Sequence, residues 1–116
     1  MDDSIKKLQS LVVKFRDERD WKQFHNIKDM MLSLLLEAGE LAEHVQWKDQ
    51  GQFSEYLEAH KDEIGDELSD VLYWVLLIAN DLDIDLKEAF HKKLDKNAEK
   101  YPVAKAKGSP CKYDKL

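Results

Sequence analysis

The sequence has little cysteine, glycine or proline: its 116 residues include one Cys, four Gly and two Pro. A single Cys111 excludes an internal disulfide framework and a cluster of thiolate metal ligands, and it fits a reducing cytosol. The scarcity of Gly and Pro disfavours a turn-rich β-sandwich and a disordered tail, whereas 36% charged residues are typical of long helices. We therefore expect an all-α protein.

Long hydrophobic runs and an excess of positive charge are also missing. No apolar run approaches the roughly 20 residues that a membrane-spanning helix needs, and the N-terminal run MDDSIKK lacks the design of a signal peptide. The 24 acidic residues outnumber the 18 basic ones, and the net charge of -6 disfavours binding to a nucleic acid polymer. We expect a cytoplasmic protein whose partners include neither a membrane nor a nucleic acid polymer.

Apolar residues recur at helical spacing in four segments. They predict helices over about 4–19, 27–48, 61–82 and 86–100, with Ser4, Asn26 and Asp85 as N-caps. The run 50–52 is expected to end the second helix, and Pro102 the fourth. We expect one domain over 1–116, a four-helix bundle-like protomer whose helical core covers 1–102. Residues 103–116 form a basic tail without helical period.

Two pairs of acidic residues lie inside apolar segments. Glu37 and Glu40 belong to the run LLLEAGELAEH, and Glu67 and Asp70 belong to the run IGDELSDVLYW. A spacing of three residues puts both members of a pair on one helix face. Two such pairs facing each other would form a cage of oxygen ligands that repel one another without a cation. The pattern therefore predicts a site for Mg²⁺, or for Mn²⁺.

Other residues share the faces that carry these acids. At about 100° per residue, His44 and Trp47 lie along the flank of the second long helix, and Glu63 and Trp74 lie along the flank of the third. The alternative is that both flanks are solvated edges of amphipathic helices. A Trp on each flank argues against that alternative, because Trp is seldom placed on a purely solvating edge. Mg²⁺ disfavours imidazole, so we expect His44 beside the ligands or at the surface rather than among the ligands.

The fourth helix carries polar residues along a face that should be apolar. Lys93 and Asn97 share this face with Phe90 and Tyr101. A cation and an amide directed inward could bind anionic oxygens of a ligand. The alternative is that Lys93 passes its aliphatic stem along the core and that Asn97 only ends the helix.

The chain resembles the MazG-like all-α nucleoside triphosphate pyrophosphohydrolases, and in particular their small dCTP pyrophosphatase branch. The resemblance covers nearly the whole sequence, through RDWKQFHNIKDMMLSLLLEAGELAEHVQWK, DELSDVLYWVLLIA and KLDKNAEKYPVAKAKGSPCKY. It implies hydrolysis of (deoxy)nucleoside triphosphates between the α and β phosphates, with Mg²⁺ held by the four acids. One departure is Ala98, where many relatives carry Arg.

The resemblance also implies roles for other residues. It places Lys93 and Asn97 near the phosphates and the sugar, with Tyr101 as a further substrate contact. Aromatic and polar residues around the base match Trp21, His25, Trp47 and Trp74. Among the acids, Glu40 is preferred over Glu37 as the general base. A homodimer or homotetramer is expected, with Trp21 and His25 reaching a neighbouring chain's site. Apolar residues away from the main helix faces support such an assembly: Leu35, Leu36, Leu76 and Leu77.

Two other classes of protein stay open from the residues alone. A carboxylate di-iron bundle also builds an acidic cage, but it calls for a Glu-x-x-His element on each of two helices. Only Glu88 and His91 have that spacing here. A non-catalytic helical assembly module would use the acidic helices merely as an oligomer interface.

Overall fold

The computed structural model describes residues 3–116, and these residues contain helices and turns but no β-strand. The helices are α1 (Ser4–Glu18), α2 (Ile27–Glu43), α3 (Gln50–Ala59), α4 (Lys61–Asp81), α5 (Leu86–Lys100) and α6 (Val103–Ala106), with 3₁₀ turns at Lys22–Phe24 and Tyr113–Lys115. The chain divides into two compact units, Met1–Asp83 and Ile84–Leu116. The expectation of an all-α fold is confirmed.

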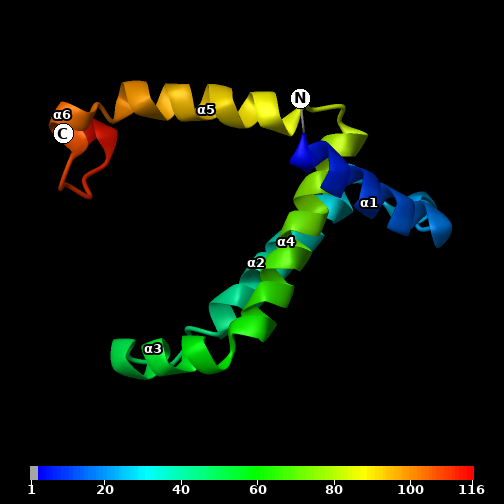
Figure 1. Cartoon of the computed structure of the whole chain (residues 1–116), viewed down its shortest axis with the longest axis horizontal. Coiled ribbons are helices and arrows are strands. Elements are labelled where there is room, and N and C mark those ends of the chain that lie inside the picture. The colour runs from blue at the N-terminus through cyan, green and yellow to red at the C-terminus, as the bar shows by residue number, and fades with distance from the viewer. Residues whose placement is uncertain (1–2) are drawn as a thin grey trace. The chain divides into compact units, whose positions relative to one another are not determined.

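The first unit is organised around α4. Helix α2 packs along α4, and α1 packs against the C-terminal half of α4, as Figure 1 shows. A hydrogen bond from Nε2 of Gln9 to the carbonyl oxygen of Leu76, 3.0 Å long, joins α1 to that half of α4. Helix α3 contacts α4 less extensively. Because α4 has neighbours on two sides, its apolar surface must be wider than a single stripe.

The buried core shows this wider surface. Leu76, Leu77 and Ala79 of α4 are buried, together with Met30 of α2. The expectation that Leu76 and Leu77 lie off the buried faces is therefore wrong, because the contact with α1 covers a part of α4 that the pairing with α2 leaves open.

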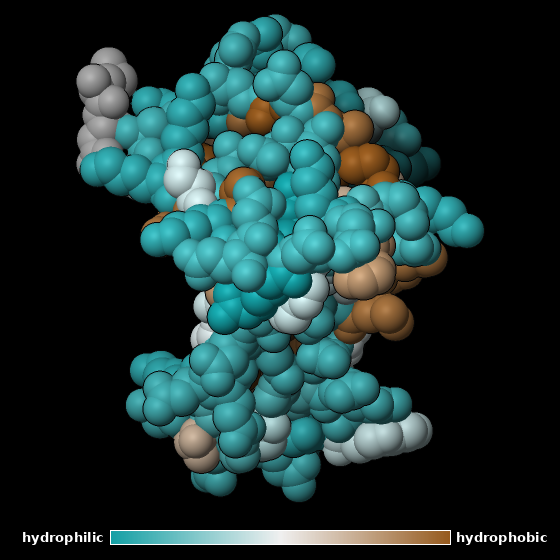
Figure 2. Space-filling view, turned by 90° about the vertical axis from the view of Figure 1, so that its right-hand side faces the viewer, coloured by the Kyte–Doolittle hydropathy of each residue, from teal (hydrophilic) through white to brown (hydrophobic). Residues whose placement is uncertain are grey.

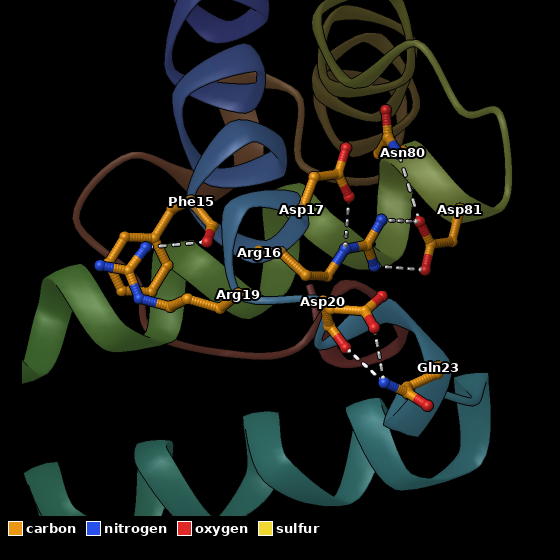
Figure 3. Close-up of polar contacts among 8 residues, drawn as sticks. All are labelled: Phe15, Arg16, Asp17, Arg19, Asp20, Gln23, Asn80 and Asp81. Atoms are coloured by element: carbon orange, nitrogen blue, oxygen red, sulfur yellow. Dashed lines mark hydrogen bonds and ion pairs between the residues drawn. The ribbon is translucent and has the colours of Figure 1, made fainter.

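A buried ion pair fastens α1 to the end of α4 (Figure 3). Arg16 is 1% exposed, and its Nη1 and Nη2 donate to the two carboxylate oxygens of Asp81 over 2.8 and 2.9 Å. This two-pronged geometry is the strongest form of the Arg–carboxylate contact. The hydrogen bond from Arg16 is the main reason that the pKa of Asp81 is lowered.

The helix boundaries confirm some predicted caps and correct others. Asn26 and Asp85 are N-caps as predicted, whereas α1 is capped by Asp3 instead of Ser4. Helix α2 ends at Glu43 and not near Lys48, because the chain turns there through Trp47, which has a φ of 67°.

The run Gln50–Gln52, expected to break a helix, instead begins one. Asp49 Oδ1 accepts a hydrogen bond from the Gln52 backbone N–H over 2.8 Å, and the Gln52 side chain accepts from the Asp49 backbone N–H. This reciprocal capping box starts α3 despite Gly51.

The second unit consists of α5 and the segment that follows it. Pro102 ends α5 as predicted, but the tail is not without helix, since Val103–Ala106 forms a single turn of helix α6. The tail then returns to the end of α5, where the Tyr113 ring meets the Tyr101 ring edge to face at 6.1 Å. The Lys100 ammonium lies 5.0 Å from the centre of the Tyr113 ring.

Many large apolar side chains reach the surface, and Figure 2 shows hydrophobic patches within a mainly hydrophilic face. On α2 these are Met31, Leu32, Leu35 and Leu36, the last two 67% and 71% exposed. Their exposure agrees with the expectation for Leu35 and Leu36. In residues 3–116, no helix combines the length and the apolar character needed to cross a membrane.

Candidate active site

The four predicted acids come from the two helices that pack along each other. Helix α2 carries Glu37 and Glu40, and α4 carries Glu67 and Asp70. The pKa of Glu37 is raised, first by burial, then by the charge of Glu40 and a hydrogen bond with its carboxyl group, and then by the charges of Asp70 and Glu67. The structure therefore brings the four carboxyl groups into one acidic cluster, here called the acid cluster.

The acid cluster has the donors that a hard divalent cation prefers. Glu37 Oε2 is buried and has no hydrogen-bond partner within residues 3–116. A cation would satisfy this oxygen and remove the repulsion that raises the pKa of Glu37. Across the described chain, no three His, Cys, Asp or Glu side chains are already gathered as tightly as a metal centre requires. The carboxylates would have to close around an ion.

A cavity of about 570 Å³ opens beside the acid cluster. Glu37 and Asp70 form part of its wall, so the cavity and the cluster are continuous. The rest of the wall is apolar or aromatic, made by Leu11, Val12, Phe15, Trp21, His25, Tyr73 and Trp74. The arrangement offers a flat, aromatic surface next to a place for charge, which suits a ligand with a planar ring and an anionic end.

The aromatic wall is a connected set of rings. Phe15 meets Trp21 at 5.8 Å and Tyr73 at 6.1 Å, and Tyr73 meets Trp74 at 5.2 Å, all edge to face. The Arg19 guanidinium lies 3.6 Å from the centre of the Phe15 ring and donates to the Phe15 carbonyl oxygen, a contact visible in Figure 3. These contacts hold rings from α1 and α4 in fixed orientations around the cavity.

His25 brings a polar group to this wall. Its ring packs against Trp74 at 5.2 Å, and its Nδ1 is buried without a hydrogen-bond partner in the described part of the chain. Burial, and then the positive charge of Arg16, lower the pKa of His25. The imidazole is therefore neutral at pH 7, with one N–H donor and one acceptor nitrogen available for recognition.

Trp21, His25 and Trp74 therefore lie together beside two of the acids, and they do so within a single chain. The expected reach of Trp21 and His25 to a neighbouring chain's site stays a prediction, since this cavity forms without it. Trp47 lies elsewhere: it follows the end of α2, is 91% exposed and does not line the cavity. Its predicted place on the flank of α2 is wrong because the helix ends before it.

Other side chains near the acids differ in their contacts. Glu63 is exposed in the first turn of α4 and is not among the charges that raise the pKa of Glu37. His44, expected beside the ligands, contacts Glu67 directly. The His60 ring stacks on the Tyr56 ring, with the ring centres 3.8 Å apart.

Sequence reasoning missed two aromatic members of the wall, Phe15 and Tyr73, besides the aliphatic Leu11 and Val12. Phe15 has the spacing of a core residue of α1, yet it is 42% exposed and borders the cavity. Tyr73 sits next to Trp74 in the sequence and so does not share its position on an ideal helical face. The signal that could have found both is another large ring nearby in the sequence, since Trp21 follows α1 and Trp74 follows Tyr73.

The remaining candidates, Lys93, Asn97 and Tyr101, belong to the second compact unit and are described within it. Lys93 is exposed on α5, Asn97 is partly buried, and Asn97 accepts a backbone hydrogen bond from Tyr101 at the end of the helix. Their roles towards a ligand stay predictions.

Comparisons with known proteins agree with this geometry. Residues 32–116 match the MazG-like family. Curated relatives named dCTP pyrophosphatase 1, from Rattus norvegicus and Homo sapiens, are 37% and 36% identical over 115 residues, which are 97% of this chain and 68% of theirs. A crystal structure of a pyrophosphatase from Archaeoglobus fulgidus superposes with a TM-score of 0.81 at 33% identity, over 88% of this chain and 95% of that one.

The family match covers most of the sequence, and both the relatives and the solved structure extend over nearly all of it. The resemblance found from the acidic pairs and the KLDKNAEKYP run is therefore confirmed, and the chain belongs to the MazG-like family of nucleoside triphosphate pyrophosphohydrolases.

Proposed function

We propose that this protein hydrolyses (deoxy)nucleoside triphosphates, with dCTP or a related deoxynucleotide as substrate, between the α and β phosphates. The products are a nucleoside monophosphate and pyrophosphate. The observation that carries the proposal is the continuity of the acid cluster with the aromatic cavity, because this arrangement has one place for phosphates and one for a base. The relatives named dCTP pyrophosphatase 1 support the choice of nucleotide.

Glu37, Glu40, Glu67 and Asp70 would hold the cation, Mg²⁺ or in its place Mn²⁺. When bound, the cation supplies positive charge that neutralises the phosphates and acidifies water. Glu40 is our choice for the group that accepts a proton from the attacking water, directly or through a second water. Its exposed position on α2 leaves room for such a water.

The base would occupy the aromatic cavity. Trp74 and Trp21 offer ring faces and edges for stacking, and neutral His25 offers a hydrogen bond to a polar edge of the base. That hydrogen bond discriminates between bases because a base that cannot form it leaves the polar group of His25 unpaired. Trp47 would contribute to the base site only if it came from another chain, since within its own chain it lies outside the cavity.

Lys93, Asn97 and Tyr101 are proposed to contact the phosphates and the sugar, on the strength of the family resemblance and their charge and hydrogen-bonding capacity. The exposed apolar side chains of α2 support a homodimer or homotetramer, because such a surface is seldom left in water. The cytoplasmic location stays a prediction.

Membership of the MazG-like family favours a hydrolase over the two other classes considered from the sequence. The di-iron alternative also lacks its second Glu-x-x-His element. An assembly module without activity would not account for a cavity continuous with the acid cluster.

The test is a turnover panel of the eight common nucleoside triphosphates and several modified ones, with Mg²⁺ and with a chelator, in which the products are identified by ³¹P NMR. We expect monophosphate and pyrophosphate, formed only with the cation and fastest from a deoxycytidine nucleotide. Release of diphosphate and orthophosphate would contradict the proposed cleavage site. Glu63→Gln is the matched control for Glu67→Gln, one helical turn away: the first should retain turnover and the second should lose it.

A further inference from the structure

A line of polar contacts connects α3 with one of the four acids. The hydroxyl oxygen of Tyr56 lies 2.6 Å from Nδ1 of His44, and Nε2 of His44 contacts Oε2 of Glu67. The His44 side chain is 11% exposed and that of Glu67 is 24% exposed, so water competes little for these contacts. The His44 imidazole, at the end of α2, therefore links Tyr56 on α3 to Glu67 on α4.

The donors and acceptors along this line match. Nε2 of His44 and Oε2 of Glu67 are in close polar contact but are not aligned as a hydrogen bond, so Oε2 is a buried oxygen without a hydrogen-bond partner among residues 3–116. An ionised Glu67 carboxylate can only accept, so the nitrogen that faces it, Nε2, is the one that carries a proton. In a neutral imidazole the other nitrogen, Nδ1, then accepts, and the Tyr56 hydroxyl donates to it. The Tyr56 hydroxyl thus acts as a donor and the Glu67 carboxylate as an acceptor. Together these two neighbours favour the tautomer of His44 that carries its proton on Nε2.

Tyr56 is itself held in place. The His60 ring stacks on the Tyr56 ring with centres 3.8 Å apart and an angle of 13°, and His60 Nδ1 lies 2.9 Å from the Tyr56 carbonyl oxygen. The Lys48 ammonium lies 4.2 Å from the centre of the Tyr56 ring. These neighbours fix the ring, and so they fix the point from which its hydroxyl donates.

We propose that His44 and Tyr56 are positioning residues for Glu67. They hold the Glu67 carboxylate in one orientation, so that it can join Glu37, Glu40 and Asp70 around a cation without first losing rotational freedom. Carboxylates and histidines around metal sites owe much of their affinity to such outer hydrogen bonds, and losing one typically costs 10- to 100-fold in metal affinity or activity. The inference rests on the proposed function, in which Glu67 is a metal ligand.

A purely structural role is the competing explanation, since the same contacts also join α3 to α4. Such a role would lower the melting temperature of a variant without a specific effect on metal binding. A positioning role instead changes the affinity for the cation in protein that remains fully folded. Metal affinity and melting temperature, measured side by side, therefore separate the two.

Tyr56→Phe is the sharpest variant, because it keeps the stacked ring and removes only the hydroxyl. We expect Mn²⁺, titrated into the full-length chain without nucleotide and followed by electron paramagnetic resonance, to bind about 10-fold more weakly. The melting temperature should stay close to that of the unsubstituted protein, and raised Mg²⁺ should restore turnover. Tyr113→Phe, a hydroxyl deletion in the other compact unit, is the matched control and should bind Mn²⁺ normally.

A double-mutant cycle extends the test to His44. His44→Leu removes both the hydrogen bond with Tyr56 and the contact with Glu67, and it should weaken Mn²⁺ binding more than Tyr56→Phe does. His44→Gln keeps a donor near Nε2 and should recover part of the affinity. In the His44→Leu background, adding Tyr56→Phe should have no further effect, because the hydroxyl acts through the imidazole. Independent, additive losses would overturn the proposal.

Glu67→Gln distinguishes the failure of this inference from that of the proposed function. If Glu67→Gln weakens Mn²⁺ binding strongly while Tyr56→Phe and His44→Leu bind as the unsubstituted protein does, only the positioning role is wrong. If Glu67→Gln binds Mn²⁺ normally, Glu67 is not a ligand, and the proposed metal site is wrong together with the inference.

Discussion

At the scale of single residues, Arg16 and Glu37 differ in whether another side chain of the same unit compensates their charge. Arg16 is 1% exposed, and Asp81 compensates its charge through two hydrogen bonds. Glu37 has a buried oxygen without a hydrogen-bond partner in residues 3–116 and lies among further acids that raise its pKa. The first charge is balanced inside the chain, and the second needs a cation from outside it.

Asp81→Asn should destabilise the protein by about 3 kcal/mol at pH 7, because it leaves the buried Arg16 charge without its partner. The pKa of Asp81 is lowered in the folded state, so this stabilisation is present above the unfolded pKa of about 3.9 and is lost as the pH falls through the folded pKa. Urea unfolding between pH 3 and pH 7 measures the difference.

The matched control for this change is Asp83→Asn, an exposed residue with a φ of 55°, a conformation that Asn tolerates well. It should leave the free energy of unfolding nearly unchanged. An Asp81→Asn variant as stable as the unsubstituted protein at pH 7 would contradict the role given to this ion pair.

His25→Phe should raise KM for the preferred nucleotide and reduce the preference among bases, because it keeps a ring against Trp74 and removes the hydrogen bond. A loss of about 10-fold in kcat/KM corresponds to one hydrogen bond of roughly 1.4 kcal/mol. His25→Gln should recover part of the preference. An unchanged ranking of bases in both variants would remove His25 from base recognition.

At the scale of elements, the junction between α2 and α3 is where sequence and structure differ most. Gly51 and its Gln neighbours look like a break, but the Asp49–Gln52 capping box starts a helix there, and the left-handed turn at Trp47 comes before it. A turn that depends on one residue with a positive φ leaves no periodic signal in the sequence. The sequence and the family resemblance therefore pointed to Trp47, but they could not show that it lies beyond the end of α2.

Asp49→Ala should remove the cap of α3 and cost about 1 kcal/mol. The loss should be local: backbone amides in the first turns of α3 should exchange with deuterium faster, while those of α4 around Leu77 should be little affected. Ser54→Ala, farther along the same exposed helix, serves as the control. Uniformly faster exchange through both helices would show that α3 does not open separately.

Much of the remaining architecture could be predicted from the sequence, because it depends on short-range signals. Helical spacing gave the α4 and α5 boundaries closely, and Asn26 and Asp85 act as caps through side chains that bond within one turn. The pairing of Glu37 and Glu40 with Glu67 and Asp70 followed from two amphipathic helices that had to bury their apolar faces together. The burial of Leu76 was misjudged because it depends on α1 crossing α4, which no local pattern encodes.

At the scale of the whole molecule, four large apolar side chains of α2 are exposed in the first unit. Met31, Leu32, Leu35 and Leu36 share the outer side of α2. A second copy of the chain is the simplest cover, in line with the assembly that the family resemblance implies.

The double variant Leu35→Lys and Leu36→Lys should therefore dissociate the assembly, because two charges cannot be buried there without partners. Analytical ultracentrifugation should show a fall from dimer or tetramer to a smaller species. Lys14→Glu, an exposed charge change on α1, should leave the mass unchanged. If the unsubstituted chain sediments as a monomer at micromolar concentration, the proposed assembly is wrong.

A cation at the acid cluster and a base in the adjoining cavity, both within one chain, can be observed together by the anomalous diffraction of Mn²⁺ in crystals of the full-length protein with a non-hydrolysable dCTP analogue. We expect a manganese peak among Glu37, Glu40, Glu67 and Asp70, with the cytosine ring against Trp74 and His25. A peak at any other residues, or a base outside the cavity, would contradict this expectation.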